Sequence, residues 1–190
     1  MGLNLRCAVI LHALIGGGKT STARAAAEMA SAEGLKVMGI LSIRVLNGSE
    51  YPCYDLLELD TGKKIPLVKP QGEALEEGWR SYDNPRFIFS KKGFHYANLA
   101  LHRGAEEMRD GVVVFVDEYG KLESQHKGIH AGAVMVADAL KRGGVAVFLC
   151  RDEKVKEVTN LVKGKAEKVF ILEAGDTDAL MRIISGCSKL

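Results

Sequence analysis

The sequence has little proline, few aromatic residues and almost no net charge. Its 190 residues include 4 prolines and a single tryptophan, and 26 lysines and arginines stand against 24 aspartates and glutamates. The near balance of charge along the chain gives no signal for nucleic-acid binding, which needs clustered basic residues. Apolar residues make up 47% of the chain, too many for an intrinsically disordered protein. At roughly 100–200 residues per domain, the length predicts one globular domain over residues 1–190.

Cysteines are also few, and long hydrophobic runs are lacking. Cys7, Cys53, Cys150 and Cys187 lie far apart with no Cys-x-x-Cys pair, so neither a zinc site nor a disulfide framework is predicted. We expect free thiols that pack as small apolar residues in a reducing compartment. No run approaches the roughly 20 apolar residues of a membrane span. The sequence therefore predicts a cytoplasmic protein without a membrane partner.

Glycine, in contrast, is abundant, with 21 residues, and short apolar runs alternate with helical periodicity. The runs typical of buried strands are residues 5–12, 35–45, 112–116, 145–150 and 168–172. Apolar stripes at helical spacing lie between them, and Asp152 is the expected N-cap of the helix that carries Val155 and Val158. This alternation predicts an α/β fold with a mainly parallel sheet covered on both faces.

One segment, residues 46–86, breaks the alternation. It contains all four prolines and Trp79. Residues 54–59 resemble a strand, and residues 60–63 resemble a turn into a second strand over 65–68. We expect a β-hairpin and a loop inserted in the α/β domain. Trp79 and Tyr82 either anchor this insertion or stack on a nucleobase.

The sequence Ala-Leu-Ile-Gly-Gly-Gly-Lys-Thr at residues 13–20 follows an apolar strand and precedes an alanine-rich helix over 21–33. This is the context of a phosphate-binding loop, the Walker A motif, although alanine replaces its first glycine. Successive backbone N–H groups of such a loop surround phosphates, and the helix N-terminus adds a favourable dipole. Lysine reaches the β- and γ-phosphates, and the threonine hydroxyl binds Mg²⁺. The residues expected to contact the nucleotide are Ala13, Gly16, Gly17, Gly18, Lys19, Thr20 and Ser21.

A second motif supports a nucleoside triphosphate as ligand. The apolar run 112–116 ends in Asp117 and Glu118, as in a Walker B strand. Asp117 is expected to hold Mg²⁺ together with Thr20. Glu118 is placed to act as general base toward the attacking water.

The run Asp-Glu-Tyr-Gly-Lys-Leu-Glu at residues 117–123 resembles the DExGKxE signature of the THEP1-type nucleoside-triphosphatases. The resemblance implies a RecA-like P-loop fold in three layers and Mg²⁺-dependent hydrolysis of ATP, GTP and other nucleoside triphosphates. Three departures mark a diverged relative. Ala13 replaces glycine, Tyr119 replaces an aliphatic residue, and the hairpin lacks a glycine- and arginine-rich stretch.

Other residues leave alternatives open. Arg151 directly follows the run 145–150 and either stabilises charge on the γ-phosphate or pairs with Asp152 or Glu153 at the surface. Glu123 either orients water or a lysine, or is a solvated loop acid. Glu123, His126 and His130 also have the spacing Glu-x-x-His-x-x-x-His, which could indicate a metal site. Solvated histidines are the favoured interpretation.

Three functions fit these motifs. Hydrolysis of nucleoside triphosphates is favoured, with catalytic roles for Lys19, Glu118 and Arg151. A small-molecule kinase would use the insertion near Trp79 to cover a second substrate. A slow nucleotide-dependent switch would act by binding a protein partner. No guanine-reading Asn-Lys-x-Asp sequence is present, so the sequence does not indicate the preferred base.

Overall fold

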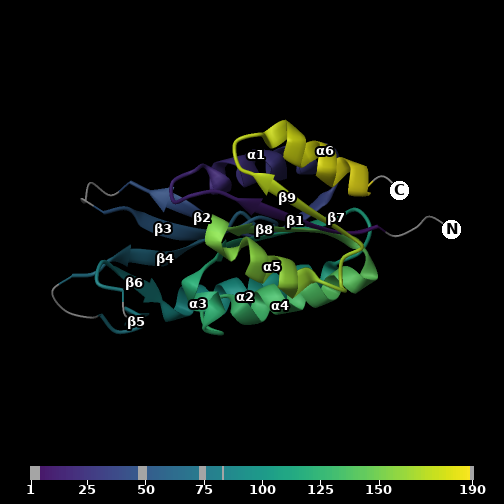
Figure 1. Ribbon diagram of the computed structural model, residues 1–190. Helices are drawn as coiled ribbons and strands as arrows, with labels where there is room; N and C mark the ends of the chain where they lie inside the picture. The colour runs from purple at the N-terminus through teal and green to yellow at the C-terminus, as the bar shows by residue number, and fades with distance from the viewer. Residues whose placement is uncertain (1–4, 47–50, 73–75, 83, 189–190) are drawn as a thin grey trace.

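The computed structural model describes residues 5–46, 51–72, 76–82 and 84–188. In this part of the chain nine strands form one sheet in the order β5-β6-β4-β3-β2-β7-β8-β1-β9 (Figure 1). The five strands from β2 to β9 in this order are parallel, and the other four continue the sheet in antiparallel pairs. The predicted α/β fold with a mainly parallel core is confirmed.

The parallel core consists of the five apolar runs recognised in the sequence. Three of its strands are buried along most of their length and a fourth over its central half, because helices cover both faces. The last strand differs from the expected buried strand, since at the sheet edge Val169 and Ile171 are exposed. The core strands are β1 (Arg6–His12), β2 (Lys36–Val45), β7 (Val112–Tyr119), β8 (Gly144–Cys150) and β9 (Lys168–Glu173).

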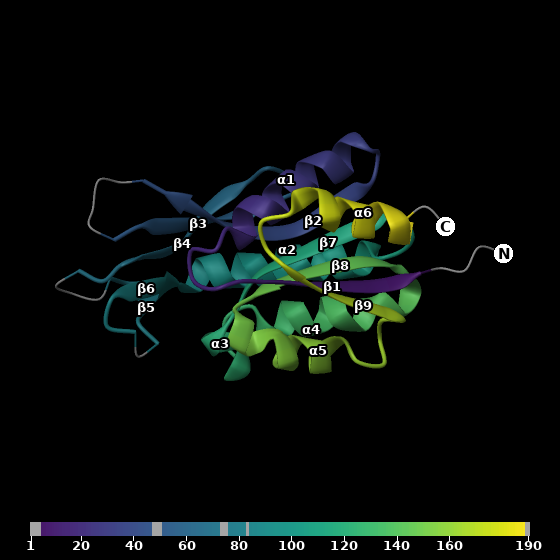
Figure 2. The same cartoon turned by 45° about the horizontal axis from the view of Figure 1, so that its top comes forward.

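Helices form a layer on each side of the sheet, which confirms the three-layer architecture (Figure 2). One face packs against α1 (Lys19–Ala32) and α6 (Thr177–Ser188). The opposite face packs against α2 (Lys91–Glu107), α4 (His130–Ala139) and α5 (Val155–Val162). Short helical turns are α3 (Lys121–Ser124), η1 (Leu140–Arg142) and η2 (Asp152–Lys154).

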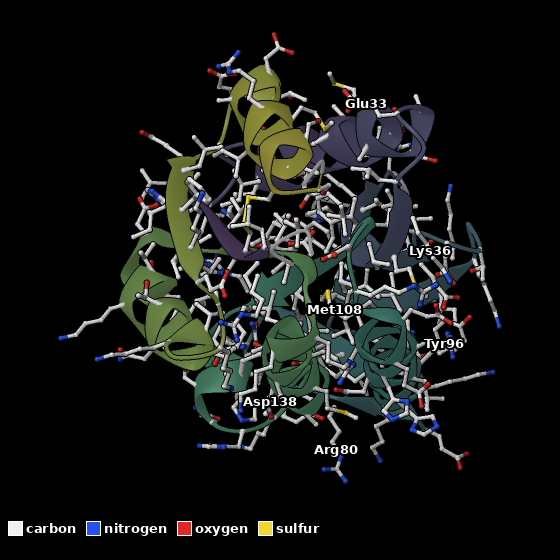
Figure 3. The ribbon with its side chains drawn as sticks, turned by 90° about the vertical axis from the view of Figure 1, so that its right-hand side faces the viewer. Glu33, Lys36, Arg80, Tyr96, Met108 and Asp138 are labelled. Atoms are coloured by element: carbon white, nitrogen blue, oxygen red, sulfur yellow. A yellow bond between two sulfur atoms is a disulfide. The ribbon has the colours of Figure 1, made fainter. Side chains whose placement is uncertain are left out.

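Side-chain positions follow this layering. In Figure 3, Met108 lies inside the molecule, whereas Arg80 extends from its rim.

The prediction that Asp152 is the N-cap of α5 is wrong. Asp152 is the first residue of η2, and Lys154 is the N-cap of α5. No described helix is long and apolar enough to cross a bilayer.

The insertion extends the sheet beyond β2. Residues 47–50, 73–75 and 83 of the predicted segment lie outside the described residues. Tyr82 packs edge-on against Phe89 and Phe94, with ring centroids 5.8 and 6.1 Å away, and so anchors the insertion. The predicted hairpin is formed by β3 (Cys53–Glu58) and β4 (Lys64–Pro70), which pair antiparallel. Two further strands follow it, β5 (Trp79–Arg80) and β6 (Phe87–Ser90).

Gly39 allows β2 and β7 to approach closely. Its φ is +97°, and a Cβ at this position would lie 2.1 Å from the carbonyl oxygen of Phe115. Any side chain would therefore push apart the two strands that end at the candidate site.

The structure corrects the expectation of four free thiols. Cys7 on β1 and Cys187 on α6 form a disulfide, although 180 residues separate them in the sequence. The bond joins the strand that leads into the phosphate loop to the C-terminal helix. Cys150 is a buried free thiol, as predicted. Spacing alone did not reveal the pair because only the packing of α6 on the sheet brings the two residues together.

Glu58 forms a buried polar cluster between β3 and α2. Its carboxylate accepts hydrogen bonds from Thr61 at 2.7 Å and Tyr96 at 2.6 Å, and it pairs with Arg103. Burial by itself raises the pKa of Glu58, but the three hydrogen bonds and the charge of Arg103 outweigh it and lower the pKa below its usual value.

We expect Glu58→Gln to lower the free energy of unfolding by about 1–3 kcal/mol at pH 7, because Arg103 loses its charged partner. A lowered pKa in the folded state means that the ionised carboxylate adds stability above pH 4.5, the usual pKa, and that this contribution is lost as the pH falls further. Urea unfolding at pH 7 and pH 4 should show a difference between variant and wild type that shrinks in acid. Glu76→Gln, at an exposed pair with Lys69, is the control and should change stability little.

Candidate active site

The motif residues gather where the parallel strands end. β1, β2, β7 and β8 run in the same direction, so their C-terminal ends meet at one edge of the sheet, where α/β proteins commonly bind ligands. The phosphate loop follows β1, the two acids lie near the C-terminal end of β7, and Arg151 follows β8. Strand pairing therefore brings both predicted motifs to one place.

The loop after β1 has the backbone that the motif requires. Gly16 and Gly18 adopt φ values of +75° and +78°, in the left-handed region that favours glycine. A Cβ on Gly17 would lie 2.7 Å from the Cβ of Ala13. Alanine in place of the first glycine is therefore accommodated because a glycine faces it.

Lys19 begins α1 and reaches back across this loop. Its Nζ donates hydrogen bonds to the carbonyl oxygens of Ala13 at 3.0 Å and Leu14 at 2.9 Å. The ammonium group therefore lies inside the curve of the loop. Ser21 follows on the first turn of α1, with an exposed side chain.

Asp117 connects the two motifs. Its Oδ2 accepts hydrogen bonds from the Thr20 hydroxyl at 2.9 Å and from the Ser42 amide at 3.0 Å, and its Oδ1 accepts one from the Glu118 amide at 2.8 Å. The residue is only 3% exposed. Burial and the neighbouring charge of Glu118 raise the pKa of Asp117 to about 7, although the three hydrogen bonds oppose the rise.

Glu118 has an unusual backbone conformation. The pairing of β7 with β8 shifts between Val116 and Tyr119, and Glu118 takes a φ of +73°. Such strain in a residue other than glycine is concentrated at functional sites. The irregularity leaves the Glu118 side chain exposed between buried neighbours. Reduced solvation within the site raises its pKa, while Ser42, Arg151 and Lys19 act in the opposite direction.

The residues fit a divalent cation. Asp117 and Thr20 offer a carboxylate and a hydroxyl oxygen, the hard ligands that Mg²⁺ prefers. Among the described residues, no lysine, arginine or histidine forms an ion pair with Asp117. Two adjacent carboxyls with raised pKa values form a site whose ionised state a cation would stabilise.

Arg151 forms the surface pair with Glu153 that the sequence offered as one alternative. Its side chain is half exposed and lies 3.9 Å from Glu153, and its charge also lowers the pKa of Glu118. The carboxylate of the next residue, Asp152, lies at hydrogen-bond distance from His12, with Oδ1 2.8 Å from Nδ1. This pair fixes the segment after β8 to the end of β1, directly before the phosphate loop.

Glu123 is not a solvated loop acid. It is 3% exposed, and its two carboxylate oxygens accept hydrogen bonds from the backbone N–H groups of Gly120 and Ile129, each at 2.9 Å. Burial raises its pKa to about 7 against these two bonds. The last glutamate of the 117–123 motif therefore closes the loop behind Glu118.

The histidines near this loop do not complete a metal site. Glu123 directs its oxygens to backbone N–H groups, and α3 ends before His126, so the three residues do not share one helix. The rings of His126 and His130 lie 4.4 Å apart. In the described part of the chain no three histidine, cysteine or acidic residues are grouped to hold a metal.

Tyr119, the unusual residue in the motif, has a partner here. Its hydroxyl donates to Glu157 on α5 at 3.3 Å, and Ser124 donates to the same carboxylate at 2.8 Å. Lys154 lies 3.2 Å from this carboxylate. Glu157 thereby connects the loop after β7 to the segment that follows Arg151.

Two site residues escaped the sequence analysis. Thr22 accepts a hydrogen bond from the Gly175 amide at 3.0 Å and so ties α1 to the loop after β9. The backbone amide of Ser42 on β2 donates a hydrogen bond to the Asp117 carboxylate. Its position as a lone polar residue within the apolar run 39–43 was the signal that could have found it.

Trp79 lies far from the phosphate loop. β5 and β1 stand seven strand positions apart in the sheet, which at about 4.8 Å per strand is roughly 30 Å. Lys69 covers its ring, with Nζ 4.3 Å from the centroid. This arrangement favours a structural role in the insertion over stacking on a nucleobase held by the loop.

Comparison with known proteins agrees with this geometry. The chain matches the NTPase family over residues 8–185. No curated protein matches the chain. A human cancer-related nucleoside triphosphatase has a similar fold, with a TM-score of 0.66 and 20% identity over 94% of this chain and 95% of that one. THEP1 from the hyperthermophile Aquifex aeolicus gives a TM-score of 0.63 and 17% identity over 94% of this chain and 98% of that one. Because the family match spans nearly the whole chain, the chain belongs to the NTPase family, the THEP1-like group that the motif at residues 117–123 indicates.

Proposed function

We propose that this member of the NTPase family is a Mg²⁺-dependent phosphohydrolase that converts ATP, GTP and related nucleoside triphosphates to the diphosphate and orthophosphate. The observation that carries the proposal is the 2.9 Å hydrogen bond between Thr20 and Asp117. It joins the residue that ends the phosphate loop to the first of the two acids near the C-terminal end of β7. Glu118 lies beside this pair with an exposed carboxylate.

Binding is assigned to the loop. The amides of Gly16, Gly17 and Gly18, with those of Lys19 and Thr20, surround the phosphates, and Ala13 and Ser21 flank them. The Lys19 ammonium group, which now donates to two loop carbonyls, pairs with phosphate oxygens instead. Thr20 and Asp117 hold Mg²⁺, which when bound neutralises charge on the β- and γ-phosphate oxygens.

Glu118 activates water in this scheme. The water oxygen forms a bond to the γ-phosphorus as its proton passes to the Glu118 carboxylate. The bond from phosphorus to the bridging oxygen breaks, and its electron pair leaves with the diphosphate. The proton on Glu118 then passes to orthophosphate, which restores the carboxylate. Arg151 stabilises the charge that develops on the γ-phosphate oxygens.

Phosphate release tests the proposal. Purified protein with ATP or GTP and Mg²⁺ should release orthophosphate without any acceptor, and excess EDTA should abolish the release. Phosphate transfer only in the presence of a second substrate would show a kinase instead. Nucleotide binding without release, until a protein partner is added, would show a switch.

A further inference from the structure

Ser42 is a buried polar residue that the proposed mechanism leaves without a role. It is 4% exposed, and among the described residues no hydrogen-bond partner reaches its Oγ. Buried hydroxyls are paired as a rule, so an exception calls for an explanation. The backbone amide of the same residue donates to Asp117, which places the hydroxyl within the candidate site.

Strand register indicates which residue the hydroxyl faces. β2 and β7 are parallel, with Ile40 opposite Val116, so Ser42 is level with Glu118 two residues further along both strands. Neighbouring residues in register point to the same face of a sheet. The shift in β7 and the φ of +73° take Glu118 out of the regular strand conformation at this level.

The electrostatics of Glu118 agree with this placement. Reduced solvation within the site raises the pKa of Glu118, and the Ser42 side chain is the largest of the influences that lower it, ahead of Arg151 and Lys19. Unlike Arg151 and Lys19, Ser42 carries no charge, so its hydroxyl affects Glu118 only at a short distance. Strand register places Ser42 level with Glu118, and its hydroxyl has no hydrogen-bond partner among the described residues.

We propose that Ser42 is a positioning residue, whose hydroxyl donates a hydrogen bond to one Glu118 carboxylate oxygen when nucleotide is bound and directs the other oxygen toward the attacking water. This inference rests on the proposed function. The hydroxyl keeps its proton throughout, and the proton from water goes to the second carboxylate oxygen. Without this bond Glu118 would sample orientations that do not face the γ-phosphate, and turnover would fall while nucleotide binding persisted.

The first test compares Ser42→Ala with Ser42→Thr. Losing one hydrogen bond to a charged group predicts a kcat roughly tenfold lower for the alanine variant, with KM and the Kd for a non-hydrolysable triphosphate analogue unchanged. Threonine keeps the hydroxyl and should restore most of kcat. Ser185→Ala, which removes an exposed hydroxyl bonded to Glu33, is the control. An unchanged kcat in Ser42→Ala, or a rise in KM and Kd with kcat kept, would overturn the proposal.

The second test asks whether Ser42 acts through Glu118. In single-turnover experiments, Ser42→Ala should lower the rate in the wild-type background but add nothing to Glu118→Gln. An equal further loss in the double variant would show that the serine acts independently, which contradicts a positioning role. If the wild-type protein releases no phosphate, the proposed function itself fails. If the wild-type protein releases phosphate and Ser42→Ala releases it at the same rate, only the positioning role fails.

Discussion

Turnover of the Glu118→Gln variant is expected to fall by about 10²–10⁴-fold, while its affinity for nucleotide stays close to that of the wild type. A positioned general base contributes a rate effect of this size. Glutamine has nearly the same shape, but it does not accept the proton from water. Glu118 is outside the phosphate loop, and its side chain is exposed, so its replacement leaves the phosphate contacts in place.

The measurement is orthophosphate release with Mg²⁺-ATP and Mg²⁺-GTP, together with calorimetric binding of each nucleotide. Glu153→Gln is the matched control, because it neutralises an exposed acid on the segment after β8 that lies near Arg151. The control should keep most of the activity. A Glu118→Gln variant that turns over normally would remove Glu118 from the mechanism and leave the water without its assigned base.

Binding of nucleoside triphosphate should weaken by roughly 100-fold in Lys19→Ala, because each charge-assisted hydrogen bond to phosphate contributes about 1.5–3 kcal/mol. Lys19 is the cation at the centre of the loop, where its Nζ reaches the carbonyl oxygens of Ala13 and Leu14. Loss of its side chain therefore removes phosphate pairing and a crosslink within the loop. Turnover at saturating nucleotide should fall as well.

Isothermal titration with a non-hydrolysable triphosphate analogue measures this effect. Lys168→Ala removes a lysine that is exposed on edge strand β9, and its affinity should match the wild type. Thermal unfolding of both variants in the absence of nucleotide separates loss of binding from loss of folding. Equal affinities in Lys19→Ala and the control would contradict the assignment of the loop as the phosphate site.

Features that depend on neighbouring residues were predictable. The glycines, Lys19 and Thr20 lie within one strand-turn-helix unit, and Asp117 and Glu118 end one apolar strand, so local patterns were sufficient to find them. The five apolar runs likewise predicted the core strands, because strands covered on both faces need continuous apolar sequence. The edge strand β9 differs, since at the sheet boundary the apolar residues Val169 and Ile171 remain exposed.

Features that depend on pairing across the chain were not predictable. Glu123 looked like a loop acid, yet the turn after β7 encloses it and gives it two backbone donors. Asp152 looked like a helix cap, but the end of β1 supplies His12 as its partner. Cys7 and Cys187 showed no pairing pattern because only the packing of α6 against the sheet joins them.

By itself, the sequence determined the fold class, the phosphate loop, the acidic strand end and the family resemblance, because each is written in contiguous residues. Tertiary structure alone decided how the glutamate of that strand end is presented, through a shift in β7 that gives Glu118 a left-handed backbone. It also decided that the backbone amide of Ser42 donates a hydrogen bond to Asp117. Sheet order and register set these relations, since they bring together residues whose separation along the chain carries no information about their contact.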